Sequence, residues 1–211
     1  MTRSNKLGAF ALAAAGALFL LYPAIRPWHD ESTVDGAAAS MGSGAWVASH
    51  TFAMFGFVLA SLGLFALRDA IRTRLTTAAA LITGVAAGLV LPYYGAETFG
   101  LHGLAQRYAE GDRFDLLAAV DAVRDQPFAI TMFGVGLLAL AAGGVLAALA
   151  VRRSGALPPA SGLLFGLGLV LFLPQFFTPA PVRIAHGALL AAGCVWLAAA
   201  LWRAPTAPQR R

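Results

Sequence analysis

The sequence is dominated by long apolar runs, most of them close to 20 residues, separated by polar segments. A helix of about 20 apolar residues crosses the hydrocarbon core of a bilayer with its backbone hydrogen bonds satisfied internally. Only 12% of the residues are charged, against about 25% in soluble proteins. The sequence therefore predicts an all-α polytopic membrane protein, folded as a six-transmembrane-helix bundle in a single integral membrane domain, 1–211. The predicted spans are about 7–25, 44–67, 75–94, 127–151, 160–177 and 183–202, followed by a disordered basic tail, 203–211.

Charge asymmetry predicts the orientation of these spans. If both termini are cytoplasmic, the inner segments carry ten basic residues and one acid, Asp69, whereas the outer segments carry five basic residues and nine acids. Cytoplasmic loops are typically enriched in Lys and Arg. We therefore expect a multi-pass protein of the plasma membrane with both termini in the cytoplasm.

Several function classes are disfavoured by what the sequence lacks. Its basic residues lie in short loops and form no stripe interleaved with aromatic residues, so a nucleic-acid partner is not expected. Cys194 is the single cysteine, which excludes an intramolecular disulfide and the CxxCH attachment of haem. No Gly-rich phosphate loop is present, which argues against ATP-driven work.

The stretch Leu91–His102 (LPYYGAETFGLH) stands where the third apolar run stops. Proline disrupts helix hydrogen bonding, so we expect Pro92 to kink this span, and Pro174 to do the same in the fifth. The third span is predicted to end at Tyr94 and to be followed by a long hydrophilic connection, Gly95–Gln126. Splayed helix ends would open a cavity toward the outer leaflet.

Polar side chains gather at the outer ends of several spans, whereas the middle and inner halves hold no ionisable group except Cys194. Ionisable groups inside a membrane are costly and are candidates for function. Glu97 is the leading candidate, because Tyr93 and Tyr94 precede it by four and three residues and share its helical face. A tyrosine hydroxyl could hydrogen-bond the carboxyl group, and partial burial would favour the protonated form of a general acid. The alternative is a solvated acid paired with Arg183 or Arg107.

Histidines form the second set of candidates. His50, with Trp46 and Met54 on its face, is interpreted as an acid/base partner of Glu97 or a haem ligand; the alternative is a structural bond to a backbone carbonyl. His186 follows Arg183 by one turn, and the alternative to a functional role is a histidine at the membrane interface. His102 lies in the connection or on a helical extension of the third span.

The connection also contains an amphipathic helix, predicted over Phe114–Gln126, with Leu116, Val120 and Val123 on its apolar face. Asp121 and Asp125, four residues apart, could bind a divalent cation through oxygen ligands, although a solvated face is the preferred interpretation.

Many aromatic residues fall in the outer halves of the spans. A lipophilic cavity walled by aromatic faces, with an acid at its mouth, suits cationic chemistry because the ring quadrupole stabilises positive charge. In size, span number, acid placement and aromatic content the chain is similar to the small multi-pass actinobacterial membrane terpene cyclases of the drimentine-pathway type. The resemblance implies proton-initiated cyclisation of a farnesyl-type chain, with Glu97 as the acid and Asp121 and His50 as further candidates. We expect no metal and no other cofactor. The predicted substrate-binding residues are Trp46, Met54, Phe99, Gln175, Phe176, Arg183 and His186.

Two other classes remain open. One is a b-type haem or quinone electron-transfer protein, in which His50 and His186 are the axial ligands. The other is a non-enzymatic accessory subunit or small-molecule carrier. The expected partners are the lipid bilayer and a lipophilic small molecule, and the oligomeric state is left open.

Overall fold

The computed structural model describes residues 3–204, and within that range it contains helices and no strands. Five helices are long and apolar enough to cross a membrane, which confirms the all-α polytopic class. The long helices are α1 (Arg3–Ile25), α3 (Gly44–Ile71), α4 (Arg74–Gly95), α7 (Pro127–Ser154) and α9 (Ala180–Arg203).

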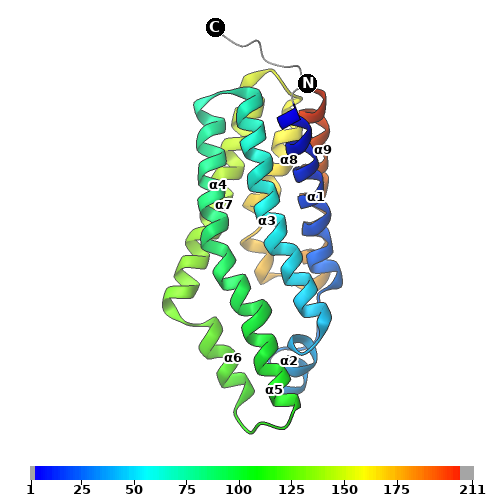
Figure 1. Ribbon diagram of the computed structural model, residues 1–211, viewed down its shortest axis with the longest axis vertical. Coiled ribbons are helices and arrows are strands. Elements are labelled where there is room, and N and C mark those ends of the chain that lie inside the picture. The colour runs from blue at the N-terminus through cyan, green and yellow to red at the C-terminus, as the bar shows by residue number, and fades with distance from the viewer. Residues whose placement is uncertain (1–2, 205–211) are drawn as a thin grey trace.

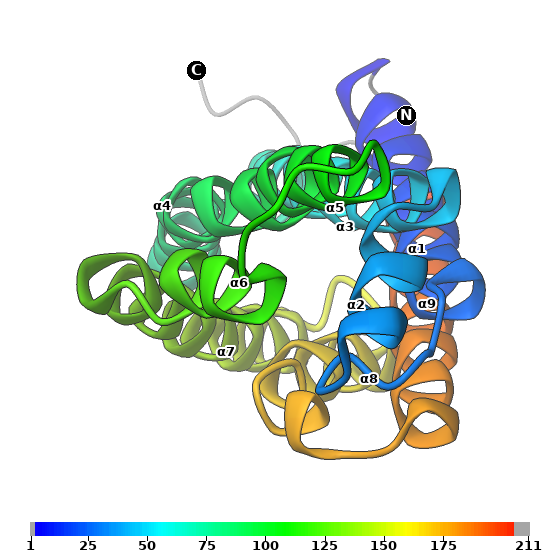
Figure 2. The ribbon, with the colours of Figure 1, turned by 90° about the horizontal axis from the view of Figure 1, so that it is seen from below.

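The long helices and the shorter α8 (Pro159–Val170) form a closed ring. Going round it, α1 packs on α3, α3 on α4, α4 on α7, α7 on α8, α8 on α9, and α9 on α1. Figure 2 shows this ring from one end, and in Figure 1 α1 begins and α9 ends at the same end of the bundle. The apolar core runs along the inside and includes Phe19, Phe57, Phe165 and Phe172, each at most 2% exposed.

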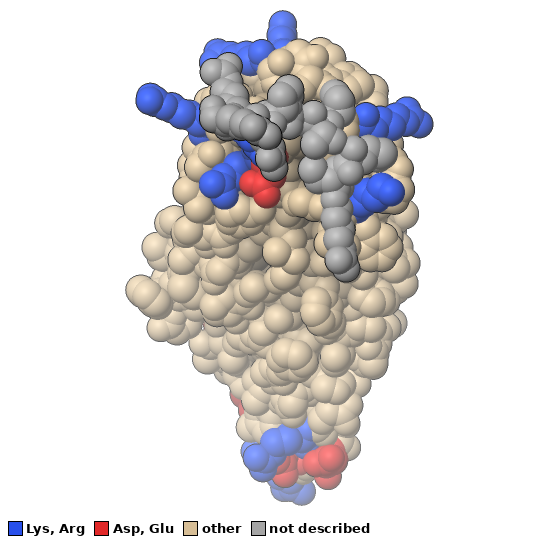
Figure 3. Space-filling model, turned by 45° about the horizontal axis from the view of Figure 1, so that its top comes forward, with Lys and Arg blue, Asp and Glu red and all other residues tan. Residues whose placement is uncertain are grey.

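The visible surface has charged side chains at its two ends and a broad uncharged belt between them (Figure 3). Exposed apolar side chains such as Leu62, Val85, Leu138 and Leu163 contribute to the outside of the bundle. A surface of this kind is compatible with a membrane location, because lipid tails cover apolar side chains at no cost. The cytoplasmic placement of the termini stays a prediction.

The third span does not end at Tyr94 as predicted. The helix continues past Pro92 to Gly95, through a π-helical segment, η1 (Ala96–Leu101), and on through α5 (His102–Ala109). Helices accommodate proline when other groups satisfy the freed backbone. The predicted hydrophilic connection is therefore largely helical, and its first part extends the long helix beyond the main bundle (Figure 1).

The fifth predicted span, 160–177, is also not one continuous helix. α8 ends at Val170, and a turn leads into a 3₁₀ helix, η2 (Pro174–Phe177). Pro174 has no N–H for the carbonyl of Val170, four residues earlier, and its ring would clash with that carbonyl, so α-helix cannot run through this point unchanged. At 12 residues, α8 is about 18 Å long, short of the roughly 30 Å hydrocarbon core.

A smaller helical cap covers one end of the ring. It consists of α2 (Val34–Met41), α5 and α6 (Leu116–Arg124), packed around a second apolar cluster. The amphipathic helix predicted over Phe114–Gln126 is present as α6: Leu116 and Val120 are almost fully buried, and Val123 packs beside them. This apolar face packs against α2 and α5.

Candidate functional site

A cavity of about 440 Å³ lies between the cap and the ring. One wall is polar and consists of Arg26, Glu31, His50, Glu97, Arg124 and Arg183. The other wall is aromatic and aliphatic and includes Tyr22, Tyr93, Tyr94, Ile130, Phe133, Leu173, Phe176 and Phe177. The cavity reaches the surface between α7 and η2, where Phe177 is 84% and Ile130 46% exposed.

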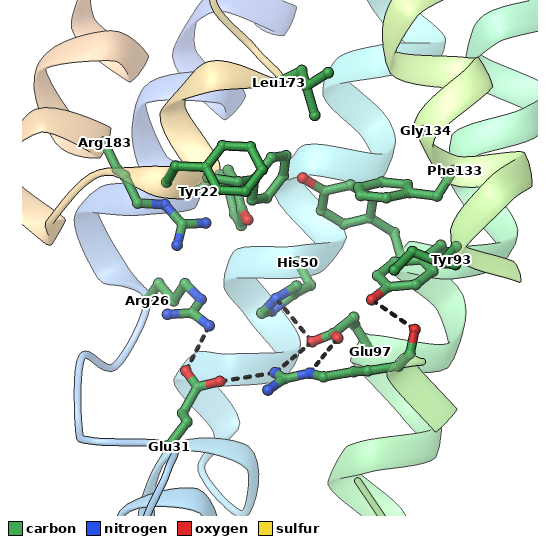
Figure 4. A pocket seen from close by; sticks show the side chains of 15 residues that line it. Tyr22, Arg26, Glu31, His50, Tyr93, Glu97, Phe133, Gly134, Leu173 and Arg183 are labelled. Carbon is green, nitrogen blue, oxygen red and sulfur yellow. Dashed lines mark hydrogen bonds and ion pairs between the residues drawn. The ribbon is translucent and has the colours of Figure 1, made fainter. Parts of the chain in front are cut away.

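Arg124 of α6 binds Glu97 of η1 through two hydrogen bonds (Figure 4). Its Nε donates to Oε1 at 2.7 Å and its Nη2 to Oε2 at 3.0 Å. Nη2 also donates to Glu31 Oε2 at 2.8 Å, and Glu31 Oε1 accepts from Arg26 Nη2 at 2.6 Å. Opposite charges thus alternate along the polar wall, and each carboxylate is held by charge-assisted hydrogen bonds.

The environment of Arg124 favours its charged form. Burial alone would lower the pKa of the guanidinium, but the hydrogen bonds and negative charges of Glu97 and Glu31 outweigh that effect and raise the pKa above its ordinary value. Arg124 is therefore a permanent cation in this site. Because it occupies both oxygens of Glu97, it binds that side chain as a carboxylate.

His50 lies about two turns into α3, next to Glu97. Its Nδ1 donates to the carbonyl oxygen of Trp46 at 2.8 Å, which leaves Nε2 turned toward Glu97 Oε2, 4.0 Å away. The Trp46 indole ring lies against the imidazole, with ring centroids 4.2 Å apart. The backbone bond expected for a structural histidine is therefore present, and the second nitrogen still faces the cavity.

The π-helical segment explains how Glu97 is held. Wider π turns disturb the regular hydrogen-bond ladder and occur at functional sites. The indole Nε1 of Trp46 donates to the backbone carbonyl of Glu97 at 2.7 Å, so α3 supplies a partner to the backbone at this point. Trp46 is fully buried behind the cavity and supports the site, rather than lining it as the prediction of a substrate-binding residue implied.

The two tyrosines line the cavity but do not hydrogen-bond Glu97. Tyr93 Oη donates to the backbone carbonyl of Arg124 at 3.3 Å, and its ring stacks on Phe133 with centroids 4.3 Å apart. Tyr94 is buried, and its hydroxyl has no hydrogen-bond partner in the described part of the chain. The expected bond from a phenol to the carboxyl group is absent among residues 3–204: Arg124 binds both carboxylate oxygens, and the Tyr93 hydroxyl bonds the Arg124 carbonyl instead.

The predicted substrate-binding residues divide into two groups. Arg183 and Phe176 line the cavity, and Gln175 lies beside them, where its Oε1 accepts from Arg183 Nε at 3.0 Å. Met54 lies outside the lining and contacts Thr98, whose hydroxyl is 3.7 Å from the Met54 sulfur. Phe99 is 61% exposed, because it follows Glu97 by two residues and points to another side of the helix.

Three further candidates lie away from the cavity. Asp121 is exposed, since it follows the buried Val120 on the outer side of α6. Residues 3–204 contain no group of three or more His, Cys, Asp or Glu side chains that could hold a metal ion, so Asp121 and Asp125 stand without further ligands of these types. His102 Nδ1 donates to the carbonyl of Met41 at 2.7 Å and joins α5 to α2.

His186 is buried between α9 and α8. Its Nε2 donates to the carbonyl of Gly168 at 2.8 Å, and its ring meets Phe172 edge-on at 5.4 Å. It does not line the cavity that His50 faces. Axial ligation of one haem would require both imidazoles to turn a free nitrogen toward the same iron, and here the Nε2 of His186 is engaged by the backbone.

Sequence reasoning missed much of the polar wall, namely Arg26, Glu31 and Arg124. One signal for Arg124 was present: it follows Val120 by four residues and Leu116 by eight, so a basic residue stands on the buried face of an amphipathic helix. Nothing comparable marks Arg26 and Glu31, which lie in an irregular polar segment. Glu97 pairs with neither Arg183 nor Arg107; Arg107 binds Asp112 instead.

The geometry thus combines a lipophilic cavity with a carboxylate and an imidazole at its polar wall. No protein-family model matches the chain, and no curated protein or solved structure matches it either.

Proposed function

We propose that this chain is a membrane-embedded enzyme that acts on a lipophilic isoprenoid-type molecule by proton transfer, with proton-initiated terpene cyclisation as the reaction. The observation that carries the proposal is the placement of Glu97 and His50, 4.0 Å apart, at the polar wall of an otherwise aromatic cavity. The exposed apolar edge at Phe177 and Ile130 supports entry of the substrate from the lipid.

The chemistry balances without a redox partner. The acid adds a proton to an alkene carbon, a second alkene donates its π electrons to the resulting cation to form a carbon–carbon bond, and a base removes a proton at the end. Tyr22, Tyr94 and Phe133 line the cavity, and the face of an aromatic ring stabilises positive charge. The net reaction is an isomerisation.

The ion pair with Arg124 sets a condition on the role of Glu97. Glu97 can deliver a proton only after it has been protonated and has left the guanidinium. His50 Nε2, 4.0 Å from Glu97 Oε2, is the nearest basic atom of the site: it takes up a proton from water and passes that proton to Glu97. We therefore assign proton delivery to the two side chains together.

The same ion pair supports a second candidate function. A carboxylate held by two hydrogen bonds to an arginine is a stable structural element. In a non-enzymatic carrier, the Arg124–Glu97 pair would form the wall of a binding pocket and take no part in chemistry. Binding without turnover separates this candidate from the enzyme.

The test uses the full chain in lipid nanodiscs, incubated with farnesylated acceptor molecules, with isomeric cyclised products measured by mass spectrometry and chromatography. Glu97→Gln and His50→Gln should each abolish product formation. Asp121→Asn is the matched control, because Asp121 is exposed outside the cavity, and it should retain full turnover.

Retention of turnover by Glu97→Gln would overturn the assignment of the acid. Wild-type protein that binds these molecules and leaves them unchanged would favour the carrier.

A further inference from the structure

One arginine of the cavity lining, Arg183, has no acidic partner among the lining residues. The lining carries three arginines and two glutamates, and Arg26, Glu31, Arg124 and Glu97 form ion pairs with one another. Arg183 forms no ion pair with any acid of residues 3–204. The cavity therefore has an excess positive charge at the side where α9 begins.

Arg183 is held firmly in this position. Its Nε donates to Gln175 Oε1 at 3.0 Å, and its guanidinium lies 4.9 Å from the ring centre of Trp28 and 5.0 Å from that of Phe176. Figure 4 shows the end of the guanidinium turned into the cavity, on the same side as Arg26. Its two terminal nitrogens remain free to donate, because the described residues supply no acceptor to them.

Other donors around the same cavity also lack acceptors. The Nε of Arg26 is buried without a hydrogen-bond partner among residues 3–204, and so are Gln175 Nε2 and the hydroxyl of Tyr94. The Arg26 guanidinium lies 4.6 Å from the ring centre of Trp28, so two guanidinium groups share one indole. Buried polar groups without partners are costly. An anion bound at the free end of the Arg183 guanidinium would balance the excess positive charge of the lining.

We propose that this end of the cavity binds the oxyanion head group, a phosphate or a carboxylate, of the lipophilic substrate. Arg183 and Arg26 hold the oxyanion, and the hydrocarbon chain lies along Phe133 and Phe176 toward the opening at Phe177. This inference rests on the proposed function, because both place the same lipophilic substrate in the cavity. It adds a charge to the substrate class, which the resemblance to terpene cyclases did not imply.

The experiment measures binding independently of turnover. Wild-type protein in phosphatidylcholine nanodiscs is titrated with tritiated farnesyl phosphate, and the label taken up by empty nanodiscs is subtracted. Unlabelled farnesyl phosphate, farnesoate, farnesol and inorganic phosphate serve as competitors. We expect the two lipophilic anions to compete at least about tenfold better than farnesol.

Variants test whether Arg183 is responsible. Arg183→Gln should reduce the preference for the anions over farnesol by about tenfold, and Arg183→Lys, which keeps the charge, should restore part of it. Arg113→Gln is the matched control, since Arg113 is an exposed arginine outside this cavity, and it should bind as the wild type does. The unfolding temperature of each variant is measured as well, so that a loss of binding can be distinguished from a loss of the fold.

The proposal is overturned if farnesol competes as well as farnesyl phosphate, or if Arg183→Gln keeps the full preference. It is also overturned if inorganic phosphate alone competes equally well, because the site would then recognise a free anion. If the protein binds these anions selectively but forms no cyclised product, the proposed reaction is wrong. The inference that the cavity binds a lipophilic anion still holds in that case.

Discussion

Arg124 and Glu97 are 27 residues apart in the chain and are joined by hydrogen bonds of 2.7 and 3.0 Å. The pair ties the cap helix α6 to the π-helical segment of the long α4–α5 helix. Through Glu31 it also reaches the segment that leads out of α1. One guanidinium thus connects three parts of the chain at the polar wall of the cavity.

Arg124→Ala is expected to destabilise the protein by about 3 kcal/mol, because it leaves the buried Glu97 without its cation and leaves Glu31 with Arg26 alone. The measurement is the apparent unfolding temperature in detergent micelles, followed by circular dichroism. Arg113→Ala, which removes an exposed arginine, is the control and should change stability little. Equal losses in the two variants would contradict a special role for the pair.

The contribution of Arg124 is expected not to vary from about pH 6 to pH 10. Its pKa is raised in the folded protein, so the stabilisation is present below the unfolded-state pKa and is lost only when the pH rises through the still higher folded value. The difference in unfolding temperature between wild type and Arg124→Ala should therefore be flat over this range. If the difference in unfolding temperature instead fell steeply between about pH 6 and pH 10, a group other than the Arg124 guanidinium would control the effect.

Trp46→Phe is expected to loosen η1, because a smaller aromatic ring replaces the indole and the N–H that reaches the Glu97 carbonyl is lost. A buried carbonyl left without a donor costs about 1–3 kcal/mol. Hydrogen exchange should accelerate over residues 96–102, and the unfolding temperature should fall. Trp196→Phe is the control: Trp196 is 44% exposed on α9, and its replacement should leave exchange in η1 unchanged.

Gly134→Leu is expected to fill part of the cavity without disturbing the fold. A Cβ at Gly134, which lines the cavity, meets no atom within 4 Å, and the change removes a helix-interior glycine, which favours the helix by up to about 1 kcal/mol. Binding of a lipophilic ligand should weaken by about tenfold or more, since each buried CH₂ of a ligand contributes about 0.8 kcal/mol.

Gly88→Leu provides the comparison for that prediction. Gly88 also has open space around a Cβ, but it faces outward from α4 and does not line the cavity. Unchanged binding in Gly88→Leu together with unchanged binding in Gly134→Leu would mean that the cavity is not where the ligand binds.

The structure corrects the sequence-based prediction mainly at two prolines. Pro92 and Pro174 carry the same local signal, yet the helix continues past the first and ends four residues before the second. The difference lies in the surroundings: past Pro92, buried side chains of η1 and the Trp46 indole hold the continuing helix against α3. Beyond α8 the chain forms a turn and a 3₁₀ helix. No local pattern distinguishes these two cases.

The amino-acid sequence by itself determined the class of this protein. The length of apolar runs and the amphipathic period of α6 are properties of short segments, and they act directly on helix formation and on burial in lipid or against a neighbouring helix. The composition of the polar wall was decided only by the tertiary structure. Glu97 meets Arg124, and Arg124 meets Glu31, 93 residues away in the chain, because the cap packs on the extended helix. Ion pairing depends on distances between side chains, and segments far apart in the chain acquire those distances only when they pack.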